Sequence, residues 1–259
     1  MIVPVDSFRC KSVSRQTFDS LIAGTEYGRA LKDATNRDLP LQDAGITRTT
    51  SALKGIDLTV DLCPSRHALE KDFFSSIINT FSSEEKPVPL AVAITGVWMR
   101  EHPDDLQWLK DNIRQRNLSI TWINHSFSHR FDPKLPLSNN FLLERGTNLR
   151  GEIINNEIAM LEDKMTPSVF FRFPGLVSDR AVFDSVVAYG LIPIGSDAWL
   201  AKGQLPSQGS IVLVHGNGNE VIGIEKFLTL LAQHSSEIRT RHWLLFDLRE
   251  SILRKEEEK

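Results

Sequence analysis

Two histidines stand four residues apart in Asn124-His125-Ser126-Phe127-Ser128-His129, directly after the apolar run of residues 118–123. A strand that ends in this way presents both imidazoles to one point in space if the chain coils by about one turn there. Paired imidazoles suit zinc and other first-row divalent ions. Two histidines at this spacing are nevertheless more common as incidental residues than as ligands, so the pair needs support from elsewhere in the chain.

Other reactive side chains also follow apolar runs. Each has an explanation that needs no function: Asp61 as a turn or cap residue, Arg172 as a surface charge, His215 as a loop histidine. In an α/β fold, however, the carboxyl ends of parallel strands carry the reactive residues. Read in chain order, these ends supply Asp61, His125, His129, Arg172, Asp197 and His215. A carboxylate, imidazoles and a guanidinium from separate strands together favour an active site.

Short apolar runs predict strands, and the patterned segments between them predict helices. Strands are expected at residues 56–63, 88–95, 118–124, 168–173, 191–195, 210–214 and 243–248. Helical stripes run through residues 69–81, 142–160, 182–189 and 224–231, and Gly190 stands where a helix C-cap belongs. Alternation of strands and helices favours parallel pairing, in an α/β barrel or a doubly wound sheet.

The remaining sequence limits the class of protein. Residues 1–54 are irregular, with one helix expected at residues 14–23, and we expect them to form an extension packed on a main domain of residues 55–259. A net charge of -3 does not favour binding to nucleic acid, which is itself negatively charged. No apolar run reaches about 18 residues, so no membrane span is expected. The two cysteines, Cys10 and Cys63, form no disulfide framework, although one bridge between them is possible.

Five sequence blocks, in this order, resemble the polysaccharide deacetylases, which carry the NodB homology domain and form carbohydrate esterase family 4. The blocks are Thr59-Val60-Asp61-Leu62-Cys63-Pro64, His125-Ser126-Phe127-Ser128-His129, Arg172-Phe173-Pro174-Gly175, Ser196-Asp197-Ala198-Trp199 and Ile211-Val212-Leu213-Val214-His215. The resemblance covers residues 56–250 and implies a distorted, incomplete (β/α) barrel of about seven strands. It also implies hydrolytic N-deacetylation of an N-acetylated glycan, such as a chitin-like, peptidoglycan or exopolysaccharide chain.

The resemblance implies a metal and a base. His125 and His129 would ligate a divalent metal, expected to be zinc, which polarises the acetamide carbonyl and activates water. Asp61 would be the general base, with Arg172 holding its carboxylate.

The resemblance likewise implies an acid and a pocket. His215 would be the general acid that protonates the departing amine, oriented by Asp197. Trp199 would line the substrate pocket, although it is nearly as plausible that this residue is simply part of the hydrophobic core. Pro174 and Gly175 would lie beside it, where the Gly175 N–H could help to stabilise an oxyanion.

The first block departs from the family pattern. Leu62 stands where the family carries its second aspartate, the third metal ligand, and Cys63 replaces the glycine that follows. The metal could still be held by the histidines, with water, Asp61 or Cys63 filling in. Cys63 would point the same way as Asp61 on an extended strand. A lone cysteine among apolar residues is more often inert, however, so we expect Cys63→Ser to change zinc retention little.

Two further interpretations stay open. The protein could be a catalytically impaired relative that only binds glycan, or it could hydrolyse another amide or ureide without a tightly held metal. Survival of the base, the acid and their partners favours hydrolysis. The N-terminal residues do not form a signal peptide, so the protein is either intracellular or begins after a removed leader. Substrates of similar proteins lie mostly outside the cytoplasm, which favours the removed leader.

Overall fold

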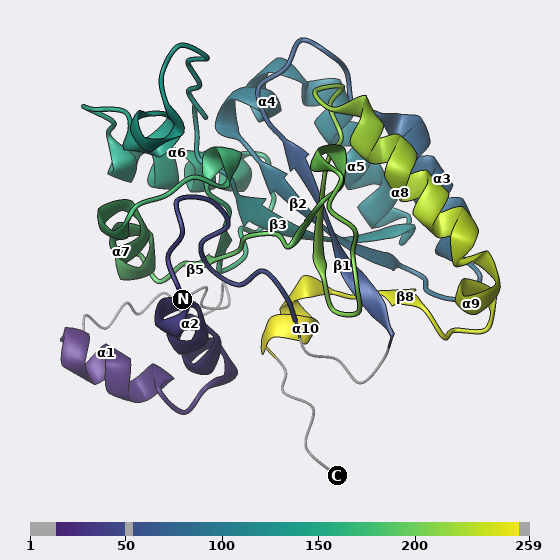
Figure 1. The fold of residues 1–259 in the computed structure, drawn as a ribbon, viewed down its shortest axis with the longest axis horizontal. Helices are drawn as coiled ribbons and strands as arrows, with labels where there is room; N and C mark the ends of the chain where they lie inside the picture. The colour runs from purple at the N-terminus through teal and green to yellow at the C-terminus, as the bar shows by residue number, and fades with distance from the viewer. Residues whose placement is uncertain (1–13, 50–53, 254–259) are drawn as a thin grey trace.

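The computed structural model describes residues 14–49 and 54–253. Within them lies one curled sheet of eight strands, paired in parallel and ordered β5-β4-β3-β2-β1-β7-β6, while β8 pairs with the start of β1 (Figure 1). The strands are β1 (Gly55–Leu62), β2 (Val88–Ile94), β3 (Leu118–Asn124), β4 (Phe170–Phe171), β5 (Ile192–Pro193), β6 (Ala198–Trp199), β7 (Ile211–His215) and β8 (Leu244–Leu245). The predicted distorted (β/α) barrel is therefore confirmed.

Ten α-helices connect and cover the strands in the described residues. They are α1 (Arg15–Ile22), α2 (Glu26–Asn36), α3 (Lys71–Phe81), α4 (Gly96–Glu101), α5 (Pro103–Arg114), α6 (Leu149–Glu162), α7 (Arg180–Ala188), α8 (Val221–Gln233), α9 (Ser235–Arg239) and α10 (Leu248–Leu253). Helices α3, α5 and α8 lie together on one side of the sheet, and α6 and α7 lie towards its β5 edge (Figure 1). In these same residues no helix is both long enough and apolar enough to cross a bilayer.

Alternation along β1 separates the core from the site. Leu58, Val60 and Leu62 are buried in the main hydrophobic cluster, together with Phe73 and Phe227 of the covering helices. Because successive strand side chains point to opposite faces, Asp57, Thr59 and Asp61 face the barrel interior. The strand that anchors the core therefore also delivers polar groups to the inside of the barrel.

All seven predicted strands are present, most of them shorter than predicted. One strand was missed: β6 has only two residues, which is too short for a periodic pattern to show. The stripe of residues 69–81 is buried as predicted, and Gly190 ends α7 with a φ of +77°. The helix expected across residues 142–160 begins only at Leu149, because Phe141–Leu143 forms a separate 3-10 turn.

Residues 42–49 link the β5 edge of the sheet to the beginning of β7. Ile46 bridges to Ile194 in parallel, and Arg48 bridges to Ser210 in antiparallel. Thr49 adds a backbone hydrogen bond, its N–H donating to Gly209 O at 2.8 Å. This segment therefore completes part of the barrel wall. The domain boundary at residue 54 stays a prediction.

Candidate functional site

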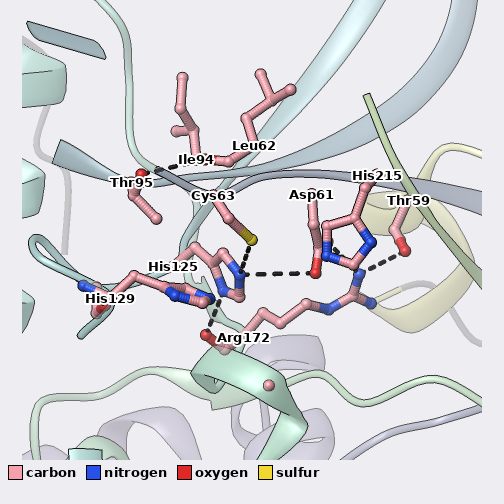
Figure 2. Close-up of polar contacts among 12 residues, drawn as sticks. Thr59, Asp61, Leu62, Cys63, Ile94, Thr95, His125, His129, Arg172 and His215 are labelled. Atoms are coloured by element: carbon pink, nitrogen blue, oxygen red, sulfur yellow. Dashed lines mark hydrogen bonds and ion pairs between the residues drawn. The ribbon is translucent and has the colours of Figure 1, made fainter. Parts of the chain in front are cut away.

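The carboxyl ends of the strands open into a cavity of about 680 Å³. Its wall combines carboxylates, imidazoles, a thiol and aromatic rings, contributed by Asp61, Cys63, His125, His129, Phe131, Phe141, Gly175, Trp199, His215 and Glu220. Figure 2 shows the histidines, Cys63 and Asp61 pointing toward one another above Arg172. Segments far apart in the sequence therefore meet at one mouth of the barrel.

Arg172 holds the Asp61 carboxylate beneath the cavity. Both residues are buried, and Arg172 Nη1 donates to Asp61 Oδ1 at 2.8 Å and to Thr59 Oγ1 at 2.6 Å. Arg172 Nη2 donates to Gly195 O at 2.9 Å, so the guanidinium is fixed on both sides. The second carboxylate oxygen, Oδ2, lies 3.6 Å from His125 Nε2. The structure thus brings together the pair that the sequence predicts, with one oxygen of Asp61 directed at the histidines.

A tight turn after β3 brings the two histidines together. Ser126 and His129 have φ values of +66° and +46°, and Glu152 of α6 accepts hydrogen bonds from two backbone N–H groups of the turn. The His125 and His129 rings consequently lie 4.8 Å apart between centroids. The coil that the spacing requires is present.

Hydrogen bonding leaves a nitrogen of each imidazole available. His125 Nδ1 lies 2.9 Å from Arg172 O, and since a carbonyl oxygen only accepts, Nδ1 carries the proton. In a neutral ring His125 Nε2 is then a lone-pair donor. His129 Nε2 is buried and has no hydrogen-bond partner among the described residues. Both rings therefore offer a nitrogen to the cavity.

Cys63 lies among these imidazoles. It is a buried free thiol, with Sγ 3.5 Å from His125 Nε2. Burial raises the pKa of this thiol, but the neighbouring His129, His215 and His125 outweigh burial and hold the pKa well below its ordinary value. Ligand atoms of Cys63, His125 and His129 all lie within 4.8 Å of one another. The residue interpreted from sequence as packing thus stands in a polar cluster.

His215 ends β7 on the other side of the cavity. Its Nδ1 forms an ion pair with Glu220 Oε2 at 2.9 Å, and the same oxygen accepts from Trp199 Nε1 at 2.7 Å. Burial lowers the pKa of His215, but Cys63, Glu220 and Asp61 outweigh it and raise the pKa well above its ordinary value. The structure therefore favours a protonated His215.

Asp197 does not occupy the position expected for it. Its Oδ2 pairs with Arg48 Nη2 at 2.6 Å, so the segment that completes the barrel wall holds this carboxylate. Glu220 takes the place beside His215 that the family pattern suggested for Asp197. Glu220 was missed, although it is the first acidic residue after His215 and follows a loop with two glycines that can fold back.

Aromatic rings border the pocket. Trp199 lies 5.9 Å from the His215 ring between centroids, as a pocket wall should. Gly175 also lines the pocket and has a φ of +60°, and the preceding residue, Pro174, is buried. A Cβ at Gly175 would lie 2.4 Å from Phe141 Cε2, so only glycine fits beside this ring. The sequence reasoning missed Phe141, whose aromatic ring packs edge-on to His129.

No family model matches the sequence. Among solved structures, a family 4 carbohydrate esterase from Bacillus anthracis aligns with 89% of this chain and 93% of its own, at 18% identity and a TM-score of 0.59. The chain has the fold of the family 4 carbohydrate esterases. A CE4 family pseudoenzyme from Bacillus anthracis aligns with 82% of this chain and 70% of its own, at 15% identity and a TM-score of 0.54. The peptidoglycan deacetylase PdaC from Bacillus subtilis covers 75% of this chain and 87% of its own, at 13% identity and a TM-score of 0.51.

The family 4 esterase fold is thus shared by a protein named as a deacetylase and by a pseudoenzyme. The fold alone does not decide between hydrolysis and binding. Whether the protein hydrolyses or only binds its ligand depends on the side chains in the cavity, above all on those around Leu62 and Cys63.

Proposed function

We propose that the protein hydrolyses the amide bond of an N-acetylated oligosaccharide or polysaccharide, releasing acetate and a free amine. One observation carries this proposal: an arginine-paired carboxylate and a glutamate-paired imidazole line one cavity, together with two further imidazoles. Asp61 and His215 supply the base and the acid that amide hydrolysis needs.

Asp61 acts as the general base. Its Oδ1 is held by Arg172, which leaves Oδ2 to take a proton from water in the cavity. Because the carboxylate is nearly fully buried, the guanidinium beside it is what makes an ionised group tenable there. Arg172 thus positions the base without touching the substrate.

His215 acts as the general acid. Its raised pKa favours the imidazolium form, and the ion pair at Nδ1 leaves Nε2 to give a proton to the departing amine. Glu220 orients the ring, the role that Asp197 was expected to have.

Two histidines of the same cavity fit a divalent ion. The Nε2 of His129, which has no hydrogen-bond partner among the described residues, and the lone-pair Nε2 of His125 are the donors that a resident ion requires. When bound, such an ion, expected to be zinc, would polarise the acetyl carbonyl and lower the pKa of water. Without an ion, the buried Nε2 of His129 would lack a hydrogen-bond partner among the described residues, which is costly.

The aromatic border supports a glycan as the substrate. Trp199 and the stacked rings of Phe131 and Phe141 line the pocket, and Phe131 is 58% exposed. Sugar rings pack their C–H faces on such surfaces. This border would equally serve a second candidate, a glycan-binding relative that lacks activity. The observation that favours it is the apolar Leu62, buried where the family has a ligand.

Acetate and free amine released from N-acetylglucosamine oligomers by the zinc-loaded protein separate the two candidates. We expect both products in equal amounts, and a loss of at least about 100-fold in rate together with loss of bound zinc in His125→Ala. His242→Ala, at an exposed histidine far from the cavity, should keep both zinc and activity. Oligomer binding without acetate would establish the binding protein, and unchanged zinc in His125→Ala would remove the proposed ligands.

A further inference from the structure

We propose that Cys63 is the third protein ligand of the metal, which makes the site a Cys-His-His set selective for thiophilic ions such as Zn²⁺ and Co²⁺ over Mg²⁺ and Ca²⁺. The inference deepens the proposed function, on which it rests, because it concerns the same cavity. Sulfur would thus replace the carboxylate that Leu62 lacks.

The backbone directs Cys63, and not Leu62, into the cavity. Leu62 is fully buried in the core between sheet and helices. Cys63 lies two residues beyond Asp61, so both side chains leave the strand on the barrel side. In Figure 2 Cys63 and Asp61 point to the histidines and Leu62 points away from them. The ligand position has therefore moved one residue along the chain.

Distances within the cluster suit one ion. Bonds of about 2.3 Å to sulfur and about 2.0–2.1 Å to nitrogen, at tetrahedral angles, would place the two ligand atoms about 3.6 Å apart. Cys63 Sγ and His125 Nε2 lie 3.5 Å apart. All three ligand atoms, including that of His129, lie within 4.8 Å of one another. The thiol thus already stands at the separation that a shared ion would impose.

The surroundings of Cys63 distinguish a ligand from a packing residue. A cysteine that only fills space contacts apolar groups, and alanine would serve nearly as well. Here the thiol faces His125, and the His129 Nε2 nearby has no hydrogen-bond partner in the part of the chain that the structure describes. His125 Nδ1 is bonded to Arg172 O, which orients its Nε2 to the same point. These contacts favour a ligand over the inert packing residue that was expected from the sequence.

The donor set determines which ions bind. Thiolate and imidazole are soft and borderline ligands that favour Zn²⁺ and Co²⁺, whereas Mg²⁺ and Ca²⁺ require oxygen. A set of two histidines and a carboxylate discriminates less between these two groups of ions, because the carboxylate supplies oxygen. Cobalt also makes the assignment visible, because a thiolate bonded to Co²⁺ gives an intense near-ultraviolet charge-transfer band.

The experiment is a Co²⁺ titration of the metal-free, reduced protein, followed by absorption. Wild type and Cys10→Ser should show the charge-transfer band with equal intensity, whereas Cys63→Ser should lack it. Cys63→Ser should also bind Zn²⁺ at least about tenfold more weakly in competition with a chromophoric chelator. Cys63→Asp should bind Co²⁺ without the band. Millimolar Mg²⁺ should leave the wild-type spectrum unchanged.

Wild-type protein with no such band, a band that survives in Cys63→Ser, or equal zinc affinity in that variant would each overturn the inference. The wild-type and Cys10→Ser spectra decide the matter even if Cys63→Ser does not fold, because Cys63 is the one cysteine left in Cys10→Ser. Acetate release keeps the two proposals apart. Hydrolysis with no thiolate band overturns the sulfur ligand alone, and a band with no hydrolysis overturns the deacetylase activity while supporting the ligand.

Discussion

Glu220 Oε2 lies 2.9 Å from His215 Nδ1, across a loop that begins directly after β7. The same oxygen accepts a hydrogen bond from Trp199. One carboxylate therefore fixes both the proposed acid and the aromatic wall against which a substrate would pack. Burial raises the pKa of Glu220, but the bonds from His215 and Trp199 outweigh burial, and the pKa is lowered.

The contact between Glu220 and His215 predicts that Glu220→Gln lowers kcat for acetate release by about 10- to 100-fold, because the acid loses its oriented, charged partner. Glu220→Asp should recover part of the loss. Steady-state kinetics on N-acetylglucosamine oligomers measure the effect, and Glu225→Gln, at an exposed glutamate of the adjoining helix, is the control. Normal kcat in Glu220→Gln would show that His215 acts without this carboxylate.

Gly175→Ala should destabilise the protein by about 1–3 kcal/mol more than Gly146→Ala. Both glycines have positive φ, of +60° and +88°, so the backbone strain is shared. Only at Gly175 would the new Cβ collide with Phe141, since nothing lies within 4 Å at Gly146. Denaturant unfolding measures the difference. Equal losses in the two variants would mean that the Phe141 ring moves freely, which would also weaken its support of His129.

Asp57 lies in the barrel interior at the opposite end from the cavity, and its buried carboxyl group should make the stability of the protein depend on pH. Burial raises the pKa of Asp57 from 3.8 to about 6, although Ser251 and Thr49 donate hydrogen bonds to it. The folded state therefore holds this proton more tightly than the unfolded chain. The contribution of Asp57 to stability is full below pH 4, falls as pH rises to about 6, and is constant above, with a total loss of at most about 3 kcal/mol.

Asp57→Asn cannot ionise, so the difference in unfolding free energy between wild type and this variant should favour wild type more at pH 4 than at pH 7. Denaturant unfolding at the two pH values gives the difference. Asp38→Asn, at an exposed aspartate, should show a much smaller change with pH. An Asp57→Asn difference that is the same at both pH values would contradict the raised pKa.

The sequence predicts which strand ends carry the site residues, because the end of a strand and the alternation of its side chains are local properties. The apolar runs locate the strand ends, and parallel pairing brings the residues at these ends to one mouth of the barrel. Extending the alternation of β1 by one residue beyond its end also places Cys63 on the same side as Asp61. The direction of each side chain could therefore be predicted from its own segment.

The remainder depends on contacts between distant segments, which no local pattern encodes. Whether a carboxylate reaches His215 depends on the fold of the loop before Glu220, and Arg48, from a segment that looked irregular, removes Asp197 from that role. The chemical surroundings of Cys63 arise only when the turn after β3 closes on it. Helix α2 was missed because its polar sequence carries only a narrow apolar stripe.

The proposed hydrolysis depends most directly on Asp61. Acetate release from N-acetylglucosamine oligomers by zinc-loaded wild type and Asp61→Asn, at equal protein and zinc content, measures that role. We predict release by wild type and a rate at least about 100-fold lower in Asp61→Asn. Equal rates in the two proteins, or no release by zinc-loaded wild type, would contradict the account.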